Sequence, residues 1–307
     1  MWVGRGRTPP PAVSMASLTI GGQAVIEGVM MRSPRYVSVA TRQPSGALAV
    51  ATRRASSLLL AARWLRLPVL RGIAVLYDAV VLGAGAILVS ANATVDGGAQ
   101  RPLTGRDVGV AVGIGLGVSL GLFFVAPTLL ARAAEPYVSS PVLFNLAEGI
   151  LRIALVVGYV AAIGHMSGLG RVYAYHGAEH KVVNAFERGL SLDVPSARAC
   201  SRFHPRCGTS FVLVVLLASI IVFAFLGRPP LGVRLAERLL LLPLIAGLSY
   251  EIIRGARRWA VLRALVAPGM WLQRLTTREP DDAQIEVAIL ALRRVAEAEA
   301  AAAPAVW

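Results

Sequence analysis

Four long apolar segments dominate the sequence and limit the folds that it can adopt. They cover residues 108–131, 143–166, 211–226 and 236–253. A helix needs about 20 apolar residues to cross a bilayer, and local thinning of the membrane accommodates a somewhat shorter one. Hydrophobic residues make up 56% of the 307 residues and charged residues only 16%. The sequence therefore predicts a mainly α-helical, polytopic membrane protein with about four transmembrane helices.

A fifth apolar stretch, residues 73–95, receives a different interpretation. It is long enough to span, but it contains Asp78 and several small residues. An even number of spans is required if both termini lie on the same side of the membrane. Four spans satisfy that requirement, so we expect 73–95 to be an interfacial or re-entrant helix.

Positive charge is concentrated between the apolar segments. The formal net charge is +14, and the basic residues gather in the 169–210 loop and after residue 253. Because Lys and Arg mark cytoplasmic loops, we expect a multi-pass protein of the cell inner (cytoplasmic) membrane with both termini in the cytoplasm. Nucleic-acid binding is the other common reason for a basic chain, but no RNP, zinc-knuckle or helix-turn-helix pattern is present. The expected partner is the lipid bilayer and not nucleic acid.

The remaining segments complete the expected domain plan. Residues 1–17 lack the apolar core of a signal peptide and are expected to be a disordered extension. Residues 18–72 should form a cytosolic segment containing β structure, since 36–40 and 47–51 alternate around a Pro-Ser-Gly turn. Residues 167–210 form a cytosolic motif loop, and 254–307 a cytosolic tail. That tail contains an amphipathic helix whose apolar stripe is Ile285, Ala288, Ile289, Leu292 and Val295.

The motif loop carries a His-x-x-Glu-His pattern formed by His176, Glu179 and His180. On a helix, residues at i and i+4 share a face, so the two imidazoles can bind one divalent metal ion. The order of the motif is that of the inverzincins. Glu179 is the candidate general base that takes a proton from a water activated by the metal. The alternative is a solvated glutamate that balances nearby basic residues.

A second segment, His204-Pro205-Arg206-Cys207-Gly208, supplies further candidate ligands. Gly189 is expected to end the motif helix, and Pro195 to begin a short helix through Phe203, after which the chain turns back. The expected metal set is His176, His180 and either Cys207 or His204, and Glu187 is a competing oxygen ligand. Imidazole and thiolate together favour Zn²⁺, while Fe²⁺ and Mn²⁺ stay open. Glu27 is either an exposed strand residue or an additional acid at the metal.

Several long motifs resemble the YqhQ-like bacterial membrane family, a domain of unknown function (1385). They are residues 21–32, the Tyr-His-Gly-Ala-Glu-His-Lys run at 175–181, His204–Thr209, Leu248-Ser249-Tyr250-Glu251 and the tail segments 273–282 and 284–288. The resemblance extends from about residue 19 to 292. It implies a membrane protein whose family is sometimes labelled a predicted metal-dependent enzyme.

Three functional hypotheses follow. The first is a metal-dependent, zinc-type hydrolase acting at the cytoplasmic membrane face, and it is the one that we favour. The second is a non-enzymatic membrane scaffold or assembly factor in which a structural metal staples the motif loop. The third is a transporter or lipid-handling protein, for which Glu148 and Arg152 within an apolar segment would be the signal. The substrate and the oligomeric state, including a homo-oligomer, stay open.

Overall fold

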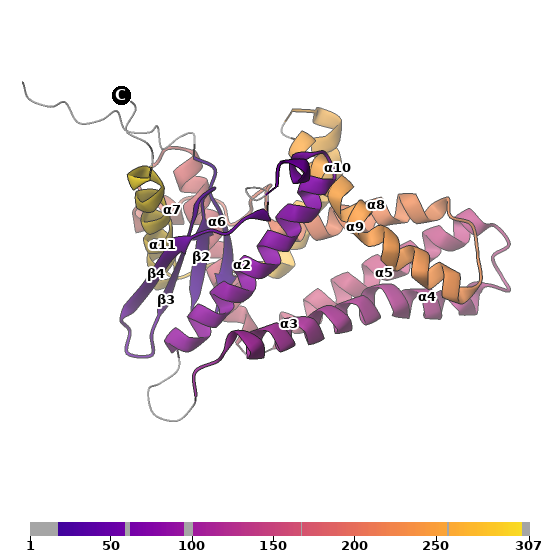
Figure 1. Ribbon diagram of the computed structural model, residues 1–307, viewed down its shortest axis with the longest axis horizontal. Coiled ribbons are helices and arrows are strands. Elements are labelled where there is room, and N and C mark those ends of the chain that lie inside the picture. The colour runs from indigo at the N-terminus through magenta and orange to yellow at the C-terminus, as the bar shows by residue number, and fades with distance from the viewer. Residues whose placement is uncertain (1–17, 59–61, 95–100, 167, 257, 303–307) are drawn as a thin grey trace, which may run out of the picture.

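A computed structural model describes residues 18–58, 62–94, 101–166, 168–256 and 258–302. A four-stranded sheet and its covering helices form one end of the molecule, and a helical bundle extends away from it (Figure 1). The expected extension 1–17 and the last residues, 303–307, lie outside the described residues.

The sheet is an antiparallel meander in the order β1-β2-β3-β4. Its strands are β1 (Gly21–Val25), β2 (Gly28–Arg32), β3 (Tyr36–Arg42) and β4 (Leu48–Arg54). The hairpin that the sequence predicted around Pro44-Ser45-Gly46 is confirmed as β3–β4, with Gly46 at a φ of 85°. The hairpin β1–β2 was not predicted, because its glycines and Glu27 do not show the alternation typical of a strand.

The helices, in chain order, run between the following residues. They are α2 (Leu70–Thr94), α3 (Gly105–Leu120), α4 (Ala126–Ala131), α5 (Pro141–Ile163), α6 (Leu169–Glu187), α7 (Val194–Arg198), α8 (Gly208–Ala224), α9 (Leu231–Gly255), α10 (Ala260–Thr276) and α11 (Asp282–Ala301). Shorter turns are η2 (Arg63–Arg66) and η4 (Arg132–Ala134), and η3 (Gly121–Val125) is a π-helical turn between α3 and α4.

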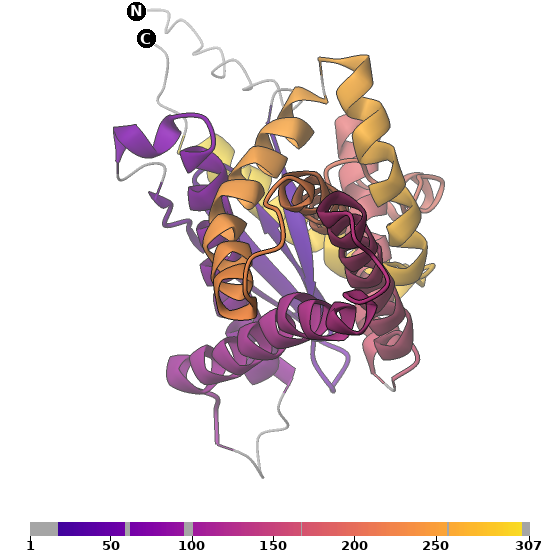
Figure 2. The ribbon, with the colours of Figure 1, turned by 90° about the vertical axis from the view of Figure 1, so that its right-hand side faces the viewer.

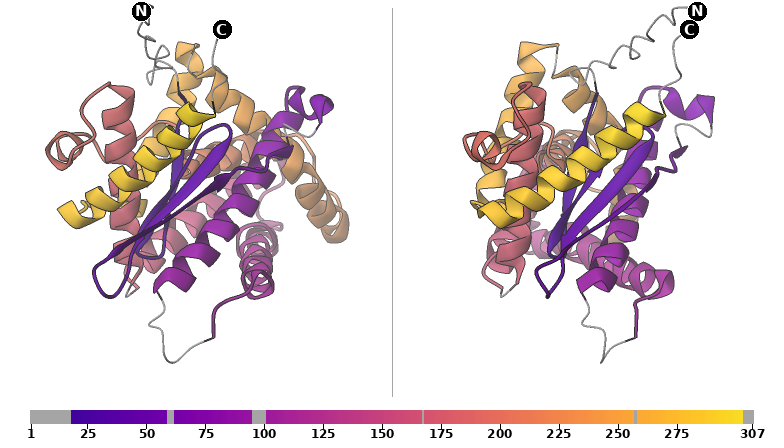
Figure 3. Two further views of the ribbon diagram at one scale, coloured as in Figure 1. Left: turned by 60° about the vertical axis from the view of Figure 1, so that its left-hand side comes forward. Right: turned by 90° about the vertical axis from the view of Figure 1, so that its left-hand side faces the viewer.

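Both faces of the sheet are covered. Alternate residues of β2 point to opposite faces, so Val29 and Met31 pack with α6 and α11, while Met30 packs with α2. Figure 3 shows α11 lying across one face of the strands and α2 lying on the opposite side. The predicted amphipathic tail helix is confirmed as α11, and every residue of its apolar stripe is buried. Its first turn is closed by a capping box between Asp281 and Gln284.

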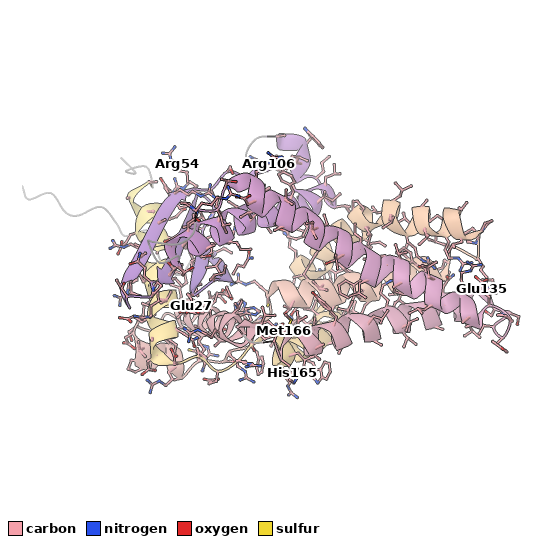
Figure 4. All side chains as sticks on the ribbon, turned by 90° about the horizontal axis from the view of Figure 1, so that it is seen from below. Glu27, Arg54, Arg106, Glu135, His165 and Met166 are labelled. Carbon is pink, nitrogen blue, oxygen red and sulfur yellow. The ribbon has the colours of Figure 1, made fainter. Side chains whose placement is uncertain are left out.

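The bundle contains two helical hairpins that point away from the sheet. One runs out through α3 and α4 and returns through α5, and the other runs out through α8 and returns through α9. Their tips meet, because the Arg228 guanidinium donates to the carbonyls of Glu135 and Val138, and Arg234 pairs with the Glu135 carboxylate at 2.9 Å. Figure 2 views the bundle from this end, and Figure 4 places Glu135 at the opposite end of the molecule from Glu27.

Three helical segments within the described residues are long and apolar enough to cross a membrane. They are Leu70–Thr94, Gly105–Ala134 and Pro141–Ile163. The two later segments that the sequence suggested as spans differ. Residues 211–226 lie largely in α8, an apolar helix of 17 residues, and 236–253 lie in α9, whose N-terminal part contains Arg234, Glu237 and Arg238. Length and composition therefore support a membrane protein, with three candidate spans among the described residues.

Residues 73–95 were expected to form an interfacial or re-entrant helix, and they lie largely in α2, one of the three candidate spans. Asp78 does not interrupt the helix, because its carboxylate accepts hydrogen bonds from Ser57 Oγ at 2.6 Å and from the Leu58 amide at 3.0 Å. The second half of α2 packs on the sheet through Ala86, Ile87 and Val89.

A buried charge network joins three of the bundle helices. Glu148 accepts hydrogen bonds from Arg152 at 2.6 Å and from Arg238 at 2.6 and 2.7 Å, and all three side chains are about 1% exposed. The π-helical turn leaves the Phe123 carbonyl free to accept from Arg152 Nε at 2.9 Å. Because these charges bind one another and a backbone carbonyl of η3, the network is suited to holding η3, α5 and α9 together.

Candidate metal centre

The His-x-x-Glu-His pattern lies on α6, a helix whose ends are well defined. The chain leaves the helix through Gly189 at a φ of 68°, where the Leu190 amide donates to the Ala185 carbonyl and the Gly189 amide to that of Phe186. This pair of bonds is the Schellman motif, which favours glycine at the left-handed position. Gly189 is thus confirmed as the predicted stop of the motif helix.

A polar face of α6 binds the backbone of the segment that follows α7. His180 Nδ1 contacts the Arg202 carbonyl at 2.6 Å, and Lys181 Nζ donates to those of Arg198 and Cys200, each at 2.9 Å. Asn184 donates to two further carbonyls of the same segment. This explains why α7 ends at Arg198 and does not reach Phe203 as expected: the carbonyls of residues 198, 200, 201, 202 and 203 contact side chains of α6 instead of later amides. These contacts place residues 204–207 beside α6.

His176, His180 and Cys207 converge at this point. The two imidazole centroids lie 4.4 Å apart, and His176 Nε2 lies 3.2 Å from Cys207 Sγ. One ligand atom from each of the three residues falls within 4.8 Å of the others. Ligand atoms of a tetrahedral zinc ion are separated by about 3.3–3.8 Å, given Zn–N and Zn–S bonds of about 2.0–2.3 Å. A small closing movement of these side chains would meet that geometry.

The outer nitrogens of both rings are held by backbone carbonyls. His176 Nδ1 lies 2.9 Å from the carbonyl of Thr276 at the end of α10, and His180 Nδ1 contacts that of Arg202. A carbonyl only accepts hydrogen bonds, so each Nδ1 carries the proton and each Nε2 presents its lone pair. Metal-binding histidines commonly have this arrangement, in which a second group orients the ring and selects the tautomer.

Glu179 is buried beside the cluster. Its Oε2 lies 3.5 Å from His180 Nε2, and the residue is 6% exposed. Burial raises the pKa of Glu179 from 4.5 to about 7, although the nearby His176 lowers it in part. The Glu179 side chain fits here because the neighbouring residue of β1, Gly22, has no side chain. A Cβ at residue 22 would lie 2.5 Å from Glu179 Cγ.

His204 lies near the three converging residues but is held by other groups. Its ring centroid is 5.8 Å from that of His180, its Nε2 is 3.4 Å from Glu187 Oε2, and its Nδ1 accepts from the Arg206 amide at 3.3 Å. Glu187 also forms an ion pair with Arg206. The structure thus brings Cys207, and not His204 or Glu187, into the same group as His176 and His180.

Glu27 lies in the turn between β1 and β2, outside this group. Its carboxylate pairs with Arg171 at 2.6 Å and accepts from the Tyr175 hydroxyl at 3.4 Å. The hydrogen bond from Arg171 holds the pKa of Glu27 below its ordinary value, against the opposing effect of burial. The contact ties the sheet to the first turn of α6, and Figure 4 shows Glu27 at the sheet end of the molecule.

A cavity of about 710 Å³ opens beside the cluster. His176, Glu179, His180, His204 and Cys207 all contribute to its lining. Ligand-binding pockets typically enclose about 300–1,000 Å³, so the space is sufficient for a small organic substrate. The cluster is therefore accessible to a ligand from one side.

Sequence reasoning did not identify several groups that shape this site. Thr276 and Arg202 contribute only their carbonyls, and no side-chain pattern reports a carbonyl. Gln273 is fully buried and binds both the amide and the carbonyl of His204, at 2.9 and 2.8 Å. The sequence feature that could have identified Gln273 is its position among apolar neighbours in an amphipathic helix.

The comparisons with known proteins agree with the resemblance noted in the sequence. Residues 67–298 match the family model described as "Protein of unknown function (DUF1385)". The chain is also 31% identical over 297 residues to "Uncharacterized protein YqhQ" of Bacillus subtilis (strain 168), covering 91% of this chain and 93% of that protein. No solved structure matches the chain. The family match and the relative together show that this chain belongs to the DUF1385 family of proteins of unknown function, the YqhQ-like family.

Proposed function

We propose that this protein is a metal-dependent hydrolase of the inner membrane, acting at its cytoplasmic face, with the metal held by His176, His180 and Cys207. One observation carries the proposal. The Nδ1 atoms of His176 and His180 contact backbone carbonyls, and His176 Nε2 lies 3.2 Å from Cys207 Sγ. All three side chains line the same cavity. The arginine-rich segments beside this end of the bundle support a cytoplasmic position for both termini and for the cluster.

The donor set fits zinc. Two neutral imidazoles and one thiolate are ligands that Zn²⁺ prefers, and three protein ligands with space for a fourth group are typical of catalytic zinc sites. A bound zinc ion would supply a Lewis acid and lower the pKa of a water molecule. Glu179 would hold that water and accept its proton, because its carboxylate lies beside His180 Nε2 and faces the cavity.

A structural metal site is the second candidate, and the position of His204 favours it. A fourth protein ligand would close the site and exclude catalysis, and the His204 ring is 5.8 Å from that of His180. For His204 to bind the metal, its Nε2 would have to leave Glu187. The two candidates therefore differ in whether metal binding depends on His204.

Metal content of the purified full-length protein tests the proposal. We expect about one zinc ion per chain, lost in His176→Ala and in Cys207→Ser because a ligand is removed. His165→Ala is the matched control, because His165 is exposed and, within the described part of the chain, its ring contacts the Ala161 carbonyl through Nδ1. A protein whose metal content is the same in His176→Ala as in the control would overturn the metal centre.

Two further variants separate catalysis from a structural metal. Glu179→Gln keeps size and hydrogen bonding but removes the proton acceptor, so it should retain the metal and lose about 10²–10⁴-fold in chelator-sensitive hydrolysis of ester and phosphoester substrates. His204→Ala should leave the metal bound. Loss of the metal in His204→Ala, or full hydrolytic activity in Glu179→Gln, would contradict the hydrolase proposal.

A further inference from the structure

The cavity beside the cluster has two chemically different sides. The inner side carries the imidazoles, Glu179 and Cys207. The opposite side is apolar and comes from helices of the bundle: Val75, Leu76, Ala79 and Leu82 of α2, Phe211 and Val212 of α8, and Ile253 of α9. A ligand that fills this space must combine a polar end with an apolar part.

The apolar side continues toward the surface of a candidate membrane span. Its four α2 residues recur at helical spacing and form one stripe, and α2 is long and apolar enough to cross a membrane. Leu76 is 38% exposed and Ala79 is also exposed, so this apolar side of the cavity is not closed over by other side chains. A hydrocarbon chain could therefore lie in the cavity while the rest of its molecule stays in the bilayer.

The charged lining residues favour an anion. Among the described residues that line the cavity, Arg32, Arg206 and Arg254 are cationic and Glu179 is the acid. Arg206 is paired with Glu187. Within the described part of the chain the half-buried Arg32 side chain makes no hydrogen bond or ion pair, and Arg254 is an exposed residue of the cavity lining. Two guanidinium groups are thus available to bind phosphate or carboxylate oxygens.

We propose that the cavity binds an anionic membrane lipid, with its headgroup at Arg32 and Arg254 and its chain along the α2 stripe. The lipid is the substrate class of the hydrolase proposed above, and to that extent the inference rests on the proposed function. The headgroup reaches the imidazole–thiol cluster, because the arginines and the cluster line the same space. If α2 lies in the membrane, as its length and composition allow, the lipid chain reaches the bilayer directly from the cavity.

Protection of Cys207 from alkylation measures whether the cavity is occupied. Full-length protein carrying Cys200→Ser is purified in detergent, treated with a chelator and reacted with N-ethylmaleimide. The measured quantity is the alkylation rate of the remaining thiol, Cys207, on the cavity wall. The probes are dihexanoyl phosphatidylglycerol, dihexanoyl phosphatidylcholine and inorganic phosphate. We expect the anionic lipid to slow alkylation at concentrations where the zwitterionic lipid and phosphate do not.

Two pairs of variants test the two sides of the cavity. Arg32→Gln should raise the half-protecting concentration of the anionic lipid by about tenfold or more, as expected for loss of a charged hydrogen bond. Arg54→Gln, an exposed arginine of β4 outside the cavity, should not. Ala79→Trp fills the apolar side and should abolish protection, whereas Val80→Trp, the adjacent residue outside the lining, should leave it unchanged.

Each remaining outcome overturns the inference. Equal protection by phosphatidylcholine excludes recognition of the charge, equal protection by inorganic phosphate excludes a role for the chain, and no protection excludes binding. Because the protein is metal-free in this experiment, the result is independent of the metal content measured above. A lipid site without a metal and a metal site without a lipid are thereby distinguished.

Discussion

Glu179 and Gly22 are in direct contact, and the contact allows an acidic side chain to be buried beside the cluster. A Cβ at residue 22 would come within 2.5 Å of Glu179 Cγ and 2.8 Å of its Oε1. The sheet and α6 are therefore joined at the site itself, where β1 passes over the carboxylate.

Gly22→Ala should displace Glu179 and destabilise the protein by about 1–3 kcal/mol, the usual cost of overpacking. Thermal unfolding in detergent measures the effect. Gly21→Ala is the matched control, because a Cβ there would meet only Arg32 Cγ, at 3.9 Å. In a Glu179→Ala background the added methyl group has space, so the two substitutions should be non-additive. Additive effects would show that the two residues are not coupled.

Gln273→Leu should weaken metal binding without removing a ligand. Its amide group binds the amide and carbonyl of His204 and the Ser210 hydroxyl, and these groups would be left buried and unpaired. Substitutions that release supporting groups typically reduce metal affinity by about 10–100-fold. Competition with a chelator measures it, with Arg274→Ala, an exposed neighbour on α10, as the control. Unchanged affinity in Gln273→Leu would mean that the 204–207 turn is positioned by other contacts.

Glu299→Gln should loosen the end of α11, and its effect should depend on pH. Burial alone would raise the pKa of Glu299, but hydrogen bonds from Ser33 Oγ at 2.6 Å and Arg35 Nε at 2.6 Å outweigh burial and hold the pKa below its ordinary value of 4.5. A lowered pKa stabilises the folded state above pH 4.5, and that stabilisation is lost as the pH falls through the folded-state value. The variant should therefore unfold at a lower temperature than wild type at pH 7, and the difference should shrink in acid.

The control for Glu299 is Glu297→Gln. Glu297 lies on the exposed side of the same helix, and among the described residues its ion pair is with Arg294 at 3.2 Å. Exposed pairs of this kind contribute little to stability, so its unfolding temperature should follow wild type at every pH. A pH-independent effect of Glu299→Gln would assign its role to packing rather than to charge.

Reporter fusions test the proposed orientation. The tips of the two hairpins contact each other through Arg228, Arg234 and Glu135, so residues 135–140 and 225–230 must lie on one side of the membrane. The proposed orientation requires both hairpins, α3–α5 and α8–α9, to cross the membrane, so reporters inserted in these two turns should be active outside the cytoplasm, and a reporter after Trp307 inside it. A C-terminal reporter that is active only outside would refute the orientation.

Local patterns predicted much of the fold. The stripe from Ile285 to Val295 and the turn at Gly46 were sufficient for α11 and the β3–β4 hairpin, because amphipathic spacing and turn residues act over a few positions. The β1–β2 hairpin was not predicted, because glycine does not favour strands. Gly22 and Gly28 are present because the backbone there lies close to α6 and β3 and leaves no room for a Cβ. The extent of α7 was wrong for a similar reason, because the carbonyls that would continue it bind α6.

The site was predictable only as a group of residue types. Helical spacing alone brings His176 and His180 together, but the choice between Cys207 and His204 depends on the turn preceding α8. That turn is held by Gln273, 69 residues further along the chain than His204. The orienting carbonyls of Arg202 and Thr276 also come from distant segments, and a sequence pattern carries no information about such contacts.

The bond between His176 and Thr276 has a consequence for biosynthesis. The two residues are 100 positions apart, and the second outward-pointing hairpin, α8–α9, lies between them in the chain. A nascent chain therefore carries both histidines of α6 long before the first is oriented. Metal capture would then come late, after the last hairpin has been inserted, and a ribosome-bound chain truncated before Thr276 would bind zinc less tightly than the finished protein.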